Sequence, residues 1–512
     1  MLIRLFKNSA AIFSSQIILT LGNLLLVPLF LKYWPVGLYG EWLALFSLVS
    51  YLTTLNLGME MAVGNRLIQH YAQGNLEEYR RCQHSAVAYY LVIALSASVL
   101  LALISWNLPV ASWLGMRETP APVACWVMFL LGLQILWNMP LNLVVGVYRS
   151  MGNLSRSQWM SNIRELLGIL FIAAVLMLGG GMTQVSLIRL TPAIIIVLYV
   201  LWDINRRYAV LTPGLSRASL MTVKELIRPG LLFVLFTFGT AISFQGPVII
   251  ISTVMGGAAV ALFVTSRTLA NLVHQMRATA LVALWPEMTR IEALGKSDEL
   301  RRLYRFLLAL TAGLSIAFAG FLWHEGGEII SIWTGGKLKA DVVLLKLLLI
   351  GIIIESPCHA SGTLMAATNR HKNVAWLALS SSAVGLGIMA LLITDMGTWS
   401  APIGLMSGVV LFLTHFVVRE ACRLVGEPYG SFACRLWGRL LLTTAVVFLT
   451  GWIAHLAIPG YFLIRWAGVG SVTVIISFIL TWTLWLTRED RMQLIARVCP
   501  LLSLAMNSRV AI

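Results

Sequence analysis

Four polar side chains recur on one face of an otherwise apolar segment that begins near residue 259. Arg267, Asn271, His274 and Arg277 are spaced by four, three and three residues, which places them on one side of a helix. A charge at mid-depth in a bilayer costs about 2.5 to 3.5 kcal/mol on insertion scales, so a charged stripe is expected to face protein or a water-filled cavity. Guanidinium groups bind phosphate oxygens bidentately. The stripe therefore predicts a cationic binding site for a phosphate-bearing substrate, with Asn271 and His274 beside the two arginines.

A third arginine, Arg189, lies inside another apolar segment and is expected to add to the same cationic cavity. Two interpretations of these residues stay open from the sequence. In the first, Arg189, Arg267 and Arg277 receive a diphosphate. In the second, Arg277 only extends its long side chain to the cytoplasmic interface.

A carboxylate and an imidazole lie one helical turn apart in a later apolar segment. Glu355 and His359 flank Pro357, which interrupts the backbone hydrogen bonds of a helix. Intramembrane carboxylates often carry the ion that drives a carrier, so Glu355 and His359 are candidates for coupling transport to protons or sodium. The alternative is a structural Glu355 that pairs with His359 or with a nearby arginine.

These residues must be positioned by membrane-spanning helices. Of the 512 residues, 59% are hydrophobic and only 11% are charged, against about 25% charged in a typical soluble domain. About 20 apolar residues cross the hydrocarbon core as a helix. We predict fourteen such spans, which begin near residues 10, 41, 85, 122, 162, 185, 229, 259, 306, 342, 374, 401, 440 and 466.

The distribution of positive charge predicts the orientation of these spans. With a cytoplasmic N-terminus, 27 of the 37 Lys and Arg residues fall in inner segments, 5 in outer segments and 5 inside spans. Both termini are therefore expected in the cytoplasm. The net charge of +16 follows from this retention, and no long basic segment indicates nucleic-acid binding. Aromatic residues at the proposed outer edges agree with the span count: Tyr33, Trp34, Trp42, Trp106, Trp113, Trp333, Trp452, Tyr461 and Trp466.

Two loops of similar sequence lie six spans apart. Residues 65–81 and 286–302 match at five of seventeen aligned positions, including Gly74 with Gly295 and Arg80 with Arg301. Six is an even number, so the two halves run in the same sense through the membrane. The predicted fold is an all-α polytopic membrane protein: a six-helix lobe over residues 1–208, a parallel repeat over 209–438, and two further helices with a cytoplasmic tail over 439–512.

The residues around the second span carry a family resemblance. They are Gly37, Tyr39, Gly40 and Trp42, then Tyr51-Leu52 and Asn56-Leu57-Gly58, then Asn65-Arg66-Leu67 and the loop from Tyr71 to Arg81. This pattern resembles the polysaccharide-export, O-antigen flippase-like branch of the multidrug, oligosaccharidyl-lipid and polysaccharide exporter superfamily. The resemblance implies two six-helix lobes around a central cavity, and transfer of undecaprenyl-diphosphate-linked oligosaccharide across a bacterial inner membrane for O-antigen, capsule or exopolysaccharide assembly. The motif is structural, and its glycines are expected to allow close helix approach.

The leading prediction is thus a flippase without enzymatic activity or cofactor, whose partners are the lipid-linked substrate, the bilayer and other polysaccharide-assembly membrane proteins. A multidrug or cation exporter of the same superfamily is the alternative, although more arginine than glutamate in the spans favours an anionic substrate. A membrane polysaccharide polymerase or ligase would need a sizeable outer loop, and none of the predicted outer segments exceeds about 17 residues. The six cysteines form no CxxC pair and no zinc-ligand spacing, so no metal site is expected.

Overall fold

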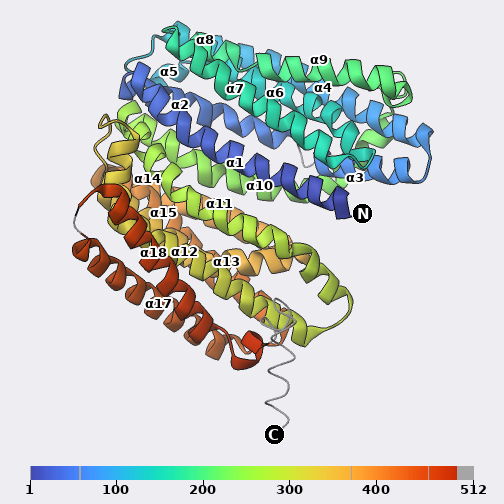
Figure 1. Ribbon diagram of the computed structural model, residues 1–512. Helices are drawn as coiled ribbons and strands as arrows, with labels where there is room; N and C mark the ends of the chain where they lie inside the picture. Colours follow the sequence, from blue (N-terminus) through green and yellow to red (C-terminus); the bar gives the residue numbers. More distant parts are fainter. Residues whose placement is uncertain (1, 57–58, 369, 371, 459, 493–512) are drawn as a thin grey trace. The chain divides into compact units, whose positions relative to one another are not determined.

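The computed structural model describes residues 2–56, 59–368, 370, 372–458 and 460–492. Leu57 and Gly58 of the family motif and Cys499 lie outside the described residues. All regular elements within the described ranges are helices (Figure 1). From the N-terminus they are α1 Leu2–Tyr33, α2 Val36–Ser50, η1 Tyr51–Asn56, α3 Met59–Ala72, α4 Leu76–Asn107, α5 Val110–Trp113, α6 Ala121–Ser150, α7 Leu154–Met177, α8 Met182–Ile188, α9 Thr191–Arg207, η2 Ala209–Leu211 and α10 Leu220–Met255. They continue as α11 Gly257–Ala293, α12 Ser297–Trp333, α13 Val342–Ala367, α14 Lys372–Met396, η3 Gly397–Trp399, α15 Ser400–Gly408, η4 Val409–Leu413, α16 Thr414–Val425, α17 Tyr429–Ala457, α18 Phe462–Leu480 and η5 Thr481–Trp485.

The chain forms two compact units. The first comprises Met1–Thr265 with Trp333–Leu338 and Ile393–Thr398. The second begins at Ser266 and contains most of α11, α12 and α14, and all of α13 and of α15 to α18. Within the first unit, α10 packs against α2, α3 and α4.

Twelve helical segments of the described chain are long and apolar enough to cross a membrane. One of them, Asn373–Val425, contains both α14 and the α15–α16 pair, which meet at the turn around Gly397. Helix α11 is not among the twelve, because its polar stripe lowers its hydropathy. When α11 is added, and Asn373–Val425 is counted as two spans, the total agrees with the predicted polytopic all-α architecture of about fourteen spans.

The repeated loop forms the same turn in both units. Helices α3 and α11 each end at a glycine with positive φ, +72° at Gly74 and +66° at Gly295. In each case the glycine N–H donates to the carbonyl three residues back, and the next N–H donates to the carbonyl five residues back. This is the Schellman end of a helix, in which the left-handed residue is best supplied by glycine.

The arginine after each turn also makes the same contact. Arg80 Nε donates to the Val210 carbonyl at 2.7 Å, and Arg301 Nε donates to the Val425 carbonyl at 2.8 Å. Val210 lies just beyond the end of α9, and Val425 is the last residue of α16. Each of these helices closes one copy of the predicted repeat. The sequence match between the two loops therefore corresponds to a match in local structure.

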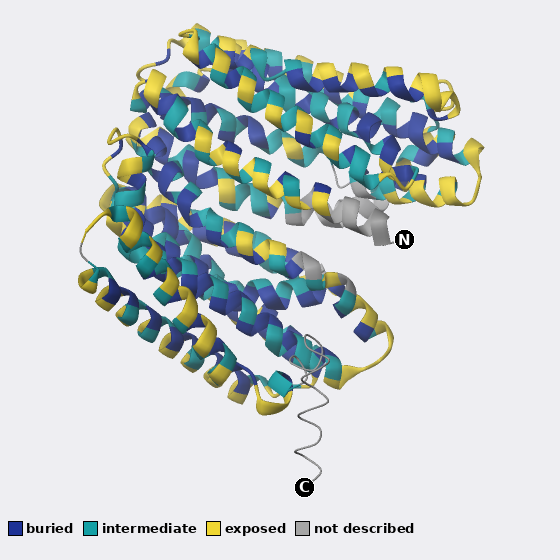
Figure 2. Cartoon of the chain, viewed as in Figure 1, coloured by how far each residue is buried: buried dark blue, intermediate teal, exposed yellow. Residues whose placement is uncertain are grey.

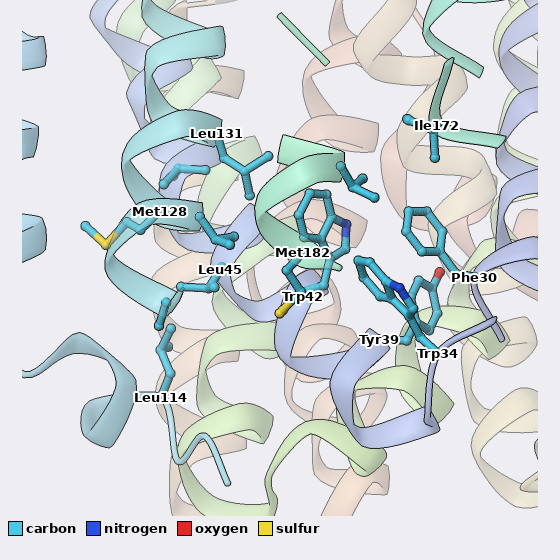
Figure 3. Close-up of a cluster of buried hydrophobic side chains, with 14 of the residues drawn as sticks. Phe30, Trp34, Tyr39, Trp42, Leu45, Leu114, Met128, Leu131, Ile172 and Met182 are labelled. Atoms are coloured by element: carbon cyan, nitrogen blue, oxygen red, sulfur yellow. The ribbon is translucent and has the colours of Figure 1, made fainter. Parts of the chain in front are cut away.

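Aromatic side chains of α1, α2 and the turn between them pack in an apolar cluster of the first unit (Figure 3). Phe30 lies 4.9 Å from Trp34 and 5.3 Å from Tyr39 between ring centroids, and Trp42 meets Trp34 edge-on at 5.7 Å. The Trp34 indole donates to the Gly180 carbonyl at 3.0 Å. Trp34 and Trp42 are thus core residues, and their placement in an aromatic belt at the membrane edge is wrong. Tyr33, Trp106, Trp113, Trp452 and Tyr461 are exposed, as such a belt requires.

The first glycines of the family motif allow backbones to touch. A Cβ at Gly40 in α2 would lie 1.7 Å from the Gly257 carbonyl oxygen at the start of α11. A Cβ at Gly257 would in turn lie 2.8 Å from Cγ of Glu41. The expected close helix approach is confirmed at this pair, since only glycine leaves room for it.

Gly40→Ala is expected to destabilise the protein by about 1 to 3 kcal/mol, because the added methyl group meets backbone atoms that cannot move independently. Thermal unfolding of the purified protein in detergent measures the effect. Gly64→Ala in α3 is the matched control, since a Cβ there meets no atom within 4 Å and alanine favours a helix. An unfolding temperature for Gly40→Ala equal to that of Gly64→Ala would contradict the close packing.

Candidate functional site

The polar stripe lies on α11, in the part of the helix that belongs to the second unit. Arg267, Asn271 and His274 are half-buried along it, and Arg277 is completely buried. The stripe runs between apolar faces that pack as core, with Leu269, Ala270 and Val273 buried. This alternation is what a helix produces when one face is reserved for polar groups.

Three of the candidate residues meet at the side chain of Glu355 from α13. The Glu355 carboxylate oxygen Oε2 lies 3.5 Å from Arg277 Nη2 and 3.4 Å from His274 Nε2. Arg277 Nη2 also lies 2.6 Å from His274 Nδ1. Hence α11 and α13 are joined by one carboxylate, one guanidinium and one imidazole inside the unit.

The hydrogen-bonding capacity of arginine fixes the state of His274 in this arrangement. A guanidinium only donates, so His274 Nδ1 must accept from Arg277 and is unprotonated. The ring proton then resides on Nε2, which faces Glu355. A second proton on His274 would place two donors against each other, so protonation of this imidazole and its contact with Arg277 exclude one another.

Pro357 shapes the α13 side of the cluster. It lies between Glu355 and His359 and has no N–H to donate to the Ile353 carbonyl. The hydroxyl of Ser356 donates to that carbonyl instead, at 2.8 Å. Arg277 Nη1 reaches the neighbouring Ile352 carbonyl at 3.4 Å. The proline thus opens the helix backbone where the buried guanidinium approaches it.

His359 contacts the cluster through a ring rather than through Glu355. Its imidazole lies 6.1 Å from that of His274 between centroids.

The alternative in which Glu355 pairs with a nearby arginine matches the contacts, with Arg277 as that arginine. The alternative in which Arg277 extends to the cytoplasmic interface is wrong, because its side chain is 0% exposed.

One hydrogen-bond donor of the Arg277 guanidinium is unused within the described chain. Its Nε–H is buried and has no hydrogen-bond partner among the described residues. A buried donor left unpaired costs about 1 to 3 kcal/mol, so a rearrangement that brings an acceptor to this atom is favoured.

Arg189 lies in the first unit, at the break between α8 and α9. Its Nε donates to Oε1 of Gln134 in α6 at 3.0 Å, and its guanidinium lies 5.1 Å from the centroid of the Phe46 ring. Because Arg189 belongs to the other unit, a single cavity shared by the three arginines stays a prediction.

Three further buried carboxylates were not predicted. Glu41 in α2 accepts from the backbone N–H groups of Arg117 at 2.6 Å and Glu118 at 2.9 Å, and from the Thr119 hydroxyl at 2.5 Å. Its partners lie in a loop more than 70 residues away. No spacing in the sequence indicates that contact.

Asp203 in α9 is completely buried and contacts two arginines. Arg156 Nη2 lies at 2.8 Å and Arg207 Nε at 3.1 Å, while the Tyr148 hydroxyl donates to the carboxylate at 2.6 Å. The four-residue spacing of Asp203 and Arg207 is the signal that could have identified this pair.

Glu325 in α12 is the third buried carboxylate. It contacts His455 of α17 at 2.6 Å and Arg465 of α18 at 3.1 Å, and Arg465 also pairs with Glu328. These residues fix the two C-terminal helices to α12. Sequence spacing brings Glu325 and Glu328 to one face of a helix but does not identify their partners.

No protein-family model matches the chain, and no curated protein sequence matches it. Solved structures do match. The inward closed lipid II flippase MurJ superposes with a TM-score of 0.70 at 13% identity, over 92% of this chain and 98% of that one. An inward-facing multidrug resistance MATE transporter of the MOP superfamily gives 0.67 at 15% identity, over 78% and 95%. An outward-facing MATE transporter gives 0.57 at 14% identity, over 82% and 96%.

These likenesses define the class of fold. The chain is a polytopic membrane protein with the all-α fold shared by MATE transporters and MurJ. The expected polytopic all-α fold is therefore confirmed. Membership of the polysaccharide-export branch stays a prediction.

Proposed function

We propose that the protein is a flippase that moves undecaprenyl-diphosphate-linked oligosaccharide from the cytoplasmic to the periplasmic leaflet of a bacterial inner membrane, with both termini in the cytoplasm. The substrate serves O-antigen, capsule or exopolysaccharide assembly, and no covalent bond changes. The observation that carries the proposal is the α11 stripe, which bears two arginines, one of which, Arg277, pairs with the intramembrane carboxylate Glu355. The excess of positive charge suits a diphosphate.

Breaking the ion pair between Glu355 and Arg277 provides a step in alternating access. Glu355 holds Arg277 by an ion pair in the state described here. A substrate phosphate competes with that carboxylate for the same guanidinium. Protonation of Glu355, or its binding of sodium, weakens the ion pair and frees Arg277 for the substrate, so ion and substrate binding are linked. Arg267 provides the second cation of the stripe.

A fold shared with the lipid II flippase MurJ supports a lipid-linked substrate, whereas a fold shared with multidrug resistance MATE transporters supports a drug or cation exporter. The positive charge of α11 supports the flippase over the exporter. A site for cations is expected to place carboxylates, rather than arginines, on the face that receives the substrate.

Deletion of the gene tests the substrate directly. Undecaprenyl-diphosphate-linked glycan is expected to accumulate on the cytoplasmic face of the inner membrane, and complementation with wild type should restore its export. Arg267→Ala is expected to export at least about tenfold less, the loss of one charged contact. Arg419→Ala, which removes an exposed arginine of the same unit, is the control at matched protein levels. Normal periplasmic glycan in the deletion strain, with increased sensitivity to cationic dyes, would favour the exporter instead.

Coupling through Glu355 gives a separate prediction. Glu355→Gln keeps the size of the side chain and one acceptor oxygen but cannot gain or lose a proton. Transport by this variant in proteoliposomes is expected to become independent of imposed proton or sodium gradients. Transport that retains the ion dependence of wild type would assign Glu355 a structural role only.

A further inference from the structure

A basic pocket lies at the end of the second unit where α12, α17 and η5 meet, apart from the α11–α13 cluster. It is a cavity of about 140 Å³ lined by Arg305, Arg435 and Arg439, with Glu427, Phe432 and Trp485. The volume is sufficient for several water molecules or one phosphate group. Three arginines and one glutamate leave an excess of two positive charges.

Two of these arginines lack an acidic partner within the part of the chain that the structure describes. Glu427 pairs with Arg305. Among the described residues, Arg435 and Arg439 form no ion pair, and they lie four residues apart on one face of α17. Like charges at this spacing destabilise a helix. An anion bound between them would remove that repulsion.

The walls of the pocket are held in place by the protein. Arg301 Nε donates to the Val425 carbonyl at 2.8 Å, which fixes the segment that carries Glu427. The indole of Trp485 donates to the Thr443 hydroxyl at 3.1 Å, and Phe432 stacks on Tyr304. Aromatic walls that are held in place around the arginines are a preorganised arrangement for an anion.

The position of the pocket along α17 indicates what kind of anion it takes. Arg435 is exposed, while Leu441 and Leu442, less than one turn beyond Arg439, present exposed apolar side chains. Exposed positions recur along the whole of α17 (Figure 2). The pocket therefore opens where polar surface changes to apolar surface. The charge distribution predicts that this end of the helix is cytoplasmic, and basic pockets between spans on that side bind lipid head groups.

We propose that this pocket binds the phosphate head group of an anionic phospholipid of the cytoplasmic leaflet, with Arg435 and Arg439 as its main contacts. The proposal is independent of the transported substrate. The bound lipid joins the C-terminal helix α17 and η5 to α12.

Lipid binding to the purified, delipidated protein in detergent tests this assignment. Native mass spectrometry is used with phosphatidylglycerol and with phosphatidylcholine of identical acyl chains. Wild type is expected to prefer phosphatidylglycerol. Arg435→Gln/Arg439→Gln is expected to bind it about 30-fold more weakly, because two basic side chains that contact the head group are lost. Arg302→Gln/Arg419→Gln removes two charges at the same end of the unit outside the pocket and should retain the preference.

A charge-preserving variant separates binding from folding. Arg435→Lys/Arg439→Lys is expected to keep the preference for phosphatidylglycerol, and the unfolding temperature of each lipid-free variant reports its fold. Equal binding of the two lipids by wild type, or equal loss in both double glutamine variants, would overturn the proposal. Displacement of phosphatidylglycerol by inorganic phosphate would assign the pocket to a soluble anion. Stronger, arginine-dependent binding of undecaprenyl diphosphate would assign it to a transport substrate.

Discussion

Arg277→Gln is expected to destabilise the protein by about 3 kcal/mol and to reduce transport by at least about tenfold. Removing one partner of a buried ion pair leaves the other charge uncompensated, which costs about 3 to 5 kcal/mol. We take the lower value because Glu355 is partly exposed. Thermal unfolding in detergent measures the stability, and glycan export in the deletion strain measures the function.

The double variant Arg277→Gln/Glu355→Gln separates these two effects. With both charges removed, two amides remain that can hydrogen-bond to each other, so most of the stability is expected to return. Export is expected to stay low, because the guanidinium that we propose as the phosphate ligand is still missing. Recovery of export together with stability would show that the pair is only structural.

Arg290→Gln on the same helix is the matched control. Arg290 pairs with Glu287 at 2.7 Å, but both side chains lie in an exposed part of α11. Exposed ion pairs contribute little because water screens them and side-chain entropy opposes them. This variant is expected to leave both unfolding temperature and export close to those of wild type.

The sequence was sufficient to predict the helices and the α11 stripe, because both depend on periodicity. Runs of apolar residues determine spans, and a spacing of four, three and three determines a face. The boundaries were less accurate: the span near residue 185 is two helices, α8 and α9, that break at Arg189. Span length alone does not locate such a break.

The partners of the charged residues were harder to predict than the residues themselves. Spacing places Glu355 on α13, but which helix it faces depends on packing between α11 and α13. The same is true of Glu41, whose oxygens accept backbone N–H groups, since these groups carry no side-chain signature. Trp34 and Trp42 show the same limit, because an aromatic residue near the end of a span suits a membrane edge and a core equally well.

The attachment of the C-terminal helices provides the second large effect. Arg465→Gln is expected to destabilise the protein by about 3 kcal/mol and to increase hydrogen exchange in α18. Glu325 is completely buried, and Arg465 is its only guanidinium partner within the described chain, so its loss leaves a carboxylate supported by His455 alone. Exchange mass spectrometry locates the change, and thermal unfolding gives its size.

Trp466→Phe is the graded control for this prediction. It removes one indole hydrogen bond to Glu328, at 3.0 Å, and leaves the ion pairs intact, so a loss of about 1 kcal/mol is expected. Arg465→Gln/Glu325→Gln should recover part of the stability, since the buried charge is then gone. If Arg465→Gln proved no worse than Trp466→Phe, charge pairing would not be what holds α17 and α18 to α12, and apolar packing between these helices would have to account for it.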